Sequence, residues 1–104
     1  MDSNTSWEPG LPMDNLIERI IQEARVVQSS VVAPYAVVDL QWVGVSGGIY
    51  QARGIAHCKD GEEMNRLFLV SLAHTRAAKA LALLYLGEDE EIYGGVAKKF
   101  AGKD

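Results

Sequence analysis

The sequence has a single cysteine, Cys58, in 104 residues. One cysteine excludes an intramolecular disulfide, and it excludes a zinc site built mainly from cysteine. This usage is typical of a reducing compartment, so we expect a cytoplasmic protein. The fold must then rest on its apolar core, and 48% hydrophobic residues are enough to build one.

Long uncharged apolar runs are also missing. The longest apolar stretch, residues 67–86, is interrupted by His74, Arg76 and Lys79, whereas a bilayer-spanning helix needs about 20 mostly apolar residues. The first residues contain neither the basic segment nor the apolar segment of a signal peptide. We therefore expect no membrane span and no signal peptide.

Positive charge is scarce. Ten basic residues face 14 acidic ones, which gives a net charge of −4. Nucleic-acid binding draws its affinity from cations that neutralise phosphates, so an acidic chain must gather its few cations on one face to bind. The charge therefore disfavours a nucleic-acid partner. The candidate contacts for such a partner are Arg53, Arg66, Arg76, Lys79, Lys98 and Lys99.

The length of the chain fits one domain. We expect a single α+β domain over residues 11–100, preceded by a disordered tail at residues 1–10 and followed by a short tail at residues 101–104. The first element is an amphipathic helix over residues 13–28, because apolar residues recur there at intervals of three and four. Those residues are Met13, Leu16, Ile17, Ile20, Ile21, Ala24 and Val27.

A β-hairpin is expected over residues 35–58. Alternation places Ala36, Val38, Leu40 and Trp42 on one face of the first strand, and Tyr50, Ala52, Gly54, Ala56 and Cys58 on one face of the second. A three-residue loop at residues 46–48 keeps both faces consistent. That loop sets Val45 opposite Ile49, Trp42 opposite Ala52 and Gln41 opposite Arg53.

The segment after the hairpin has two interpretations. We favour one long helix over residues 62–86, ended by Gly87, and the alternative is a third strand at residues 66–72 followed by a shorter helix. An acidic turn at residues 88–91 and a weak segment at residues 92–100 follow. The predicted fold is an N-terminal amphipathic helix, an antiparallel hairpin of two or three strands, and a long Ala/Leu-rich C-terminal helix packed on the sheet.

Motifs for catalysis or metal binding are weak. His57 and Cys58 are adjacent on a strand, so their side chains point to opposite faces, and Cys58 fits a small core position. His57 and His74 match no metal-ligand spacing. The glycine-rich residues 44–48 lie between strands, whereas a phosphate-binding loop leads into a helix. We expect no enzyme activity, no cofactor and no metal.

Residues 73–87, AHTRAAKALALLYLG, carry a resemblance. This segment resembles the last helix of double-stranded-RNA-binding domains, in which basic residues open an Ala-rich helix. With a strand at residues 66–72, the order helix, three strands, helix over residues 13–86 is also that family's order. The family's Lys-Lys pair is replaced here by His74-Thr75 with Arg76, and its Gly-rich approach is missing. The helix is also similar to the Ala-rich helix of phage-type single-strand annealing proteins. Either resemblance implies nucleic-acid binding.

The apolar content of the long helix points to association. A helix that is apolar all round must be buried all round, and a two-stranded sheet is too small to cover it. We therefore expect a homodimer. The candidate interface consists of Leu67, Val70, Ala77, Leu81 and Leu84.

The expected function is a small non-catalytic interaction module that binds a protein partner. The alternatives are a nucleic-acid-binding domain and a small enzyme or ligand-binding protein with a pocket between hairpin and helix.

Overall fold

The computed structural model describes residues 11–44, 47–88 and 91–101. The predicted tail at residues 1–10 lies outside this part, as do residues 102–104 of the predicted tail at 101–104 and also Val45, Ser46, Asp89 and Glu90. Ala101, the first residue of that predicted C-terminal tail, is instead the end of a strand. The elements in chain order are α1 (Leu11–Glu23), β1 (Arg25–Val32), β2 (Tyr35–Val43), β3 (Ile49–His57), α2 (Arg66–Tyr85), β4 (Glu91–Ile92) and β5 (Gly95–Ala101). The fold is α+β, as predicted.

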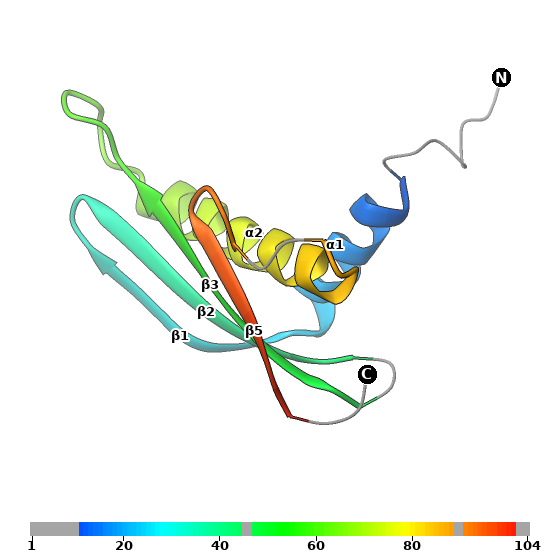
Figure 1. Ribbon diagram of the computed structural model, residues 1–104. Coiled ribbons are helices and arrows are strands. Elements are labelled where there is room, and N and C mark those ends of the chain that lie inside the picture. Colours follow the sequence, from blue (N-terminus) through cyan, green and yellow to red (C-terminus); the bar gives the residue numbers. More distant parts are fainter. Residues whose placement is uncertain (1–10, 45–46, 89–90, 102–104) are drawn as a thin grey trace, which may run out of the picture.

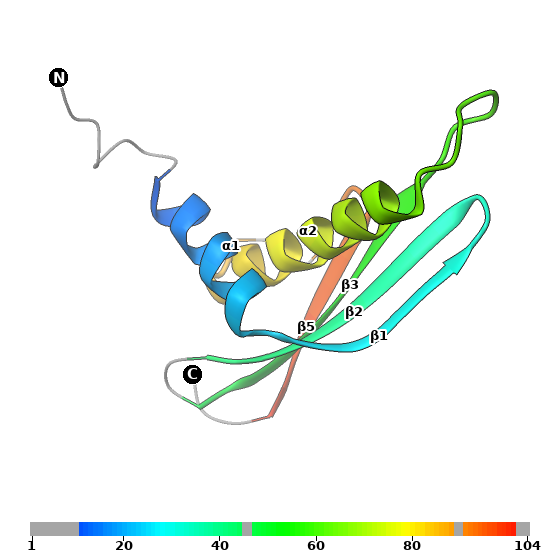
Figure 2. The ribbon, with the colours of Figure 1, turned by 180° about the vertical axis from the view of Figure 1, so that it is seen from behind.

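The strands form one antiparallel sheet in the order β1-β2-β3-β5-β4. Both helices lie on the same side of this sheet, as Figures 1 and 2 show from opposite directions. The predicted hairpin of two or three strands is therefore the centre of a five-stranded sheet. The long helix packs on the sheet as expected, although two strands follow it in the chain.

The first correction concerns the end of α1. The helix begins close to the predicted position but ends at Glu23, and the chain continues as strand β1 from Arg25. The valines at 26 and 27 fit a helical spacing, but β-branched residues followed by Gln28 and two serines favour an extended chain. β1 pairs with β2 along its whole length, with a bulge between Val26 and Gln28. The third strand therefore precedes the hairpin in the chain.

The ambiguous segment after the hairpin is helical. α2 spans 20 residues from Arg66 to Tyr85, so the favoured long helix is confirmed and the strand at residues 66–72 is wrong. The helix starts four residues later than predicted because Asn65 is its N-cap. The Asn65 side chain accepts a hydrogen bond from the Phe68 N–H at 3.0 Å.

The faces of the hairpin are confirmed, but its register is wrong by two residues. Trp42 lies opposite Tyr50, and Asp39 lies opposite Arg53. β2 ends at Val43 and β3 begins at Ile49, so the connection is five residues long, and the Gly44 N–H closes it on the Gly48 carbonyl at 2.7 Å. A shift of two residues keeps every side chain on its face, because strand side chains alternate with a period of two.

The core lies where α2 crosses β3. A Cβ at Gly54 would lie 1.8 Å from the Ala73 carbonyl oxygen and 2.6 Å from the Ala77 nitrogen, so glycine is required for this close approach. Ala73, Ala77 and Leu81 of α2 are completely buried there. By length and composition α2 could cross a bilayer, but this test is also passed by the buried helix of a packed domain. The buried face of α2 agrees with a helix packed inside a domain.

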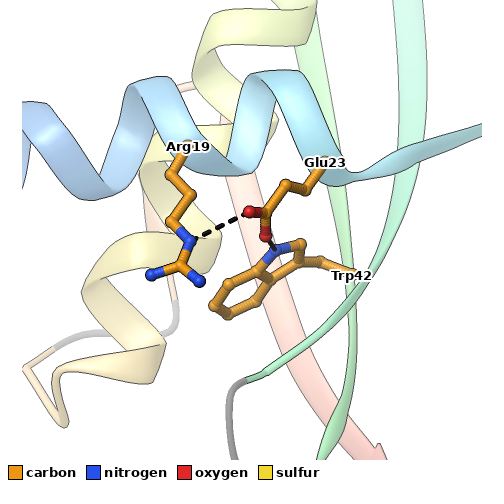
Figure 3. A network of polar contacts seen from close by, with 3 residues as sticks. All are labelled: Arg19, Glu23 and Trp42. Carbon is orange, nitrogen blue, oxygen red and sulfur yellow. Dashed lines mark hydrogen bonds and ion pairs between the residues drawn. The ribbon is translucent and has the colours of Figure 1, made fainter.

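The end of α1 is fixed to the sheet by a polar contact, drawn in Figure 3. The Trp42 indole N–H donates to one oxygen of Glu23 at 3.1 Å, and Arg19 donates to the other at 3.0 Å. These hydrogen bonds, that of Arg19 first, lower the pKa of Glu23. The Trp42 ring also meets Tyr85 edge to face, with 5.1 Å between ring centroids. Strand β2 thereby holds both helices.

The weak segment predicted at residues 92–100 is a hairpin of β4 and β5. Its turn contains Gly94 with a φ of +78°, and β5 pairs with β3 from Gly54 to Ile49. Gly95 lies under α2, where a Cβ would be 2.7 Å from the Arg76 carbonyl oxygen. The glycine pair that weakened the prediction is what allows the hairpin to fit beneath the helix.

Candidate functional site

The face of the sheet that points away from both helices is the main candidate site. We call it the open face. It comprises the odd-numbered residues 35–43 of β2 and 49–57 of β3, with residues 25, 28, 30 and 32 of β1 and residues 96 and 98 of β5, as the strand register requires. Val27 and Phe100, which lie at irregularities of the pairing, join it in a surface depression. Figures 1 and 2 show no helix below this face.

The open face is more apolar than a sheet face in contact with water needs to be. Tyr35, Val43 and Ile55 are exposed on it, and so are Val32 and Phe100, with exposed fractions of 70% and 60%. Single exposed apolar residues are normal on a protein surface. Several on one sheet face make this face the largest departure from that pattern among the surfaces described above, and so the main candidate for an interaction site.

An open depression of about 320 Å³ lies at the centre of this face. Its lining includes Asp39, Gln51, Arg53, Lys98 and Phe100. A second depression shares Arg53 with the first and extends to Glu91 and Tyr93. Polar groups thus lie in the middle of the face, with apolar side chains around them.

The polar centre is a two-bonded ion pair between neighbouring strands. Arg53 donates to both oxygens of Asp39, at 2.7 and 3.0 Å. Hydrogen bonding to Asp39 raises the pKa of Arg53, which is charged at any physiological pH. The Lys98 side chain makes no hydrogen bond or ion pair with the described residues, whereas its backbone belongs to the ladder with β3. Its ammonium group is therefore free to meet a carboxylate of another molecule.

The six candidate nucleic-acid contacts do not lie together. Arg53 and Lys98 are on the open face, whereas Lys99 is in the alternate position of β5, and Arg66 and Lys79 are exposed on α2. Arg76 donates to the Ile55 carbonyl at 2.8 Å and lies 5.1 Å from the centre of the Tyr93 ring. Arg76 therefore connects α2 to the edge of β3 and to the β4–β5 turn.

The five residues of the predicted oligomer interface are also separated. Ala77 and Leu81 are completely buried in the chain's own core, and Val70 and Leu84 pack partly against it. Leu67, with 85% of its surface exposed, is the one member left on the surface. The sheet covers this stripe because it has more strands than expected, so a second chain is not needed to bury it.

The remaining candidate residues are His57, Cys58 and His74, and their surroundings lie within the fold. His57 stacks on Tyr35 with 4.8 Å between ring centroids. Cys58 lies just beyond β3 and packs partly against the core, with its sulfur 3.6 Å from the Glu62 carbonyl oxygen. Nε2 of His74 is buried without a hydrogen-bond partner in the described structure, and desolvation lowers the pKa of His74. Within the described ranges, no three His, Cys, Asp or Glu residues are placed to hold a metal ion.

The sequence itself contains one indication that this side of the hairpin is unusually apolar. Val37, Val43 and Ile55 occupy the positions that alternation assigns to the solvent side of the hairpin. A fully solvated side would carry polar residues there.

Comparison of the chain with protein-family models, curated proteins and solved structures finds no match. The fold and the site define the class of this protein, which is an α+β domain with helices on one face of an antiparallel sheet and the other face uncovered.

Proposed function

We propose that this protein is a small, non-catalytic, cytoplasmic interaction module that binds a protein partner through the open face. One observation carries the proposal: apolar side chains are exposed across a sheet face that neither helix covers. A protein interface typically has an apolar centre with interspersed hydrogen-bonding and charged groups, and aromatic residues and arginine are enriched in it. Tyr35, Phe100 and Arg53 provide that composition here.

The charges on the open face favour a protein over a nucleic acid. Three cations of this face, Arg25, Arg53 and Lys98, stand against the two carboxylates Asp39 and Glu91. Arg53 is already paired with Asp39, and Arg25 donates to the Gln41 side chain at 3.3 Å. A phosphate backbone requires several unpaired cations along its path. The surface that fits is a largely apolar protein face with a carboxylate placed to reach Lys98.

The test is to capture partners with two matched double variants as bait. Phe100→Glu with Lys98→Glu changes the open face. Phe68→Glu with Lys79→Glu makes the same substitutions on α2, where Phe68 has an exposed fraction of 62%, close to that of Phe100. The partner captured from nuclease-treated extract of the source cell is purified and titrated against all three proteins.

We expect the wild type and the α2 variant to bind the purified partner alike, and the open-face variant to bind at least about tenfold more weakly, as loss of an aromatic anchor implies. Equal binding by all three proteins would refute the assignment to the open face.

Nucleic-acid binding, the function implied by the two resemblances, stays the alternative. It is tested by fluorescence anisotropy with labelled duplex RNA, duplex DNA and single strands at about 50 mM salt, where phosphate contacts are strong. We expect no submicromolar binding. Submicromolar binding that weakens steeply with salt would replace the protein-binding proposal.

A further inference from the structure

Strand β1 is an unprotected edge of the sheet. It pairs only with β2, and it is eight residues long, whereas β4 at the other edge has two residues. Arg25 at its start is its only charged residue, and the strand contains no proline. Edge strands are usually kept from pairing with another chain by charges, prolines or bulges. The bulge at Val26–Gln28 lies near one end and leaves the run from Gln28 to Val32 regular.

The sequence of this edge is nearly the same in both directions. Residues 26–32 read VVQSSVV, so Ser29 is the centre, with a polar residue on each side and two valines beyond. Two copies of such a strand in antiparallel alignment place valines near valines and polar residues near polar residues. A strand of unrelated sequence would match this symmetric arrangement of valines and polar residues only by chance.

The faces of β1 agree with the same centre. Val26 and Val31 both point to the helix side, because they lie opposite the buried Leu40 and Ala36. The bulge makes Val27 and Gln28 together occupy one position of the ladder. Counting outward from Ser29, Val31 then faces Val26 of a second copy on the helix side, and Ser30 faces Gln28 on the open face. Arg25 faces Val32, so no like charges meet.

We propose that β1 pairs antiparallel with β1 of a second copy about a two-fold axis at Ser29. The two sheets then form one ten-stranded sheet, with all four helices on one side and the two open faces joined on the other. The unpaired backbone groups of the two β1 edges are satisfied, and the exposed Val26 and Val32 of each copy gain a neighbouring side chain across the new strand pair. This proposal gives the homodimer expected from the sequence a different interface, at β1 in place of the α2 stripe, and it does not depend on what binds the open face.

Ser29 is the decisive position for a test, because the two-fold axis places Ser29 of one copy directly opposite Ser29 of the other. We expect sedimentation equilibrium at about 10–100 μM to give twice the chain mass of 11.3 kDa for the wild type. Ser29→Lys and Ser29→Glu should each sediment as a monomer, since like charges placed directly opposite are destabilising. An equimolar mixture of the two should regain the dimer mass.

Thr75→Lys and Thr75→Glu are the matched controls, because Thr75 is exposed on α2. Both should stay dimeric. A monomeric wild type, or Ser29→Lys that remains a dimer, would overturn the proposal, and partner capture by the open face would be unaffected by either result.

A second measurement decides the matter if the charged variants do not fold. In a Cys58→Ala background, Ser29→Cys places two thiols opposite each other, within the Cα separation of about 4.4–6.8 Å that a disulfide requires. Mild oxidation should convert most of this protein into a linked dimer, and Thr75→Cys in the same background should remain largely unlinked. Equal, slow linkage of both variants would contradict pairing at Ser29.

Discussion

The two faces of the sheet are built from the same strands and differ in nearly every property. On the helix side, the residues of β2 and β3 are buried and become small where α2 comes closest, at Ala52, Gly54 and Ala56. On the open face, the alternate residues are larger, more varied and partly or fully exposed, and they surround an ion pair. The helix side is thus determined by packing within the chain. The open face has no such constraint, and its exposed apolar residues are the basis of our proposal that a second molecule contacts it.

The two faces should differ most in the loss of stability caused by substitution at Gly54 and at its neighbour Ile55. Gly54→Val should cost about 3 kcal/mol or more, the upper range for overpacking, because the new side chain meets the backbone of α2 and cannot be accommodated by a rotamer change. Ile55→Val, one residue further on the open face, should cost less than about 1 kcal/mol. Urea unfolding of both variants checks the contrast, and native stability of Gly54→Val would show that α2 does not lie against β3.

The leucines of α2 give the next largest effect. Leu81→Ala should lower the free energy of unfolding by about 2–5 kcal/mol, because Leu81 is completely buried. Leu67→Ala should change it by less than about 0.5 kcal/mol, as is usual for exposed positions. Equal losses in the two variants, measured at a protein concentration at which sedimentation shows a monomer, would mean that Leu67 is also covered within the chain.

Arg76 is a cation that holds parts of the fold together, whereas Lys79 is a solvated one, and the two can be compared by substitution. Arg76→Ala should cost about 1–2 kcal/mol, because it removes the hydrogen bond to the Ile55 carbonyl and the contact with the Tyr93 ring. Lys79→Ala should be nearly neutral. Thermal unfolding compares them, and a larger loss for Lys79→Ala would contradict the structure around the β4–β5 turn.

The smallest effect is the pH dependence contributed by His74. Burial lowers the pKa of His74 in the folded protein, so between about pH 6.5 and the lowered value the unfolded state binds more protons than the folded state. Stability should therefore fall as the pH is lowered from about 7 to 5.5. His74→Gln should show a weaker fall over the same window in urea unfolding. An identical slope in the wild type and the variant would show that His74 does not titrate there.

Periodicity predicted the parts of the fold in which one face is strongly apolar. The alternation from Ala36 to Trp42 fixed the faces of the hairpin, and the Ala- and Leu-rich run gave the long helix. The predicted end of the first helix was wrong because Val26 and Val27 fit both a helical and an extended pattern. The register was wrong because the length of a glycine-rich connection does not determine which residues oppose each other. β4 and β5 were predicted only as a weak segment, because Gly94 and Gly95 weaken a strand pattern and are explained only by contact with α2.

The candidate site was less predictable than the fold. The candidate cations were chosen by residue type alone, whereas their distribution over both sides of the sheet depends on the register and on the position of β5. The pair of Asp39 and Arg53 follows from the observed register and is absent from the predicted one. The open face could be recognised only after the two helices were found on the same side.

The central claim, that a protein covers the open face, is tested most directly by hydroxyl-radical footprinting of Phe100 and Phe68. These two phenylalanines have nearly equal exposed fractions, 60% and 62%, and lie on opposite sides of the molecule. The ratio of their oxidation is compared between the purified protein and the same protein bound to its partner from nuclease-treated cell extract. We predict that oxidation of Phe100 falls severalfold while that of Phe68 is unchanged. Unchanged oxidation of Phe100, or an equal fall at both residues, would contradict the claim.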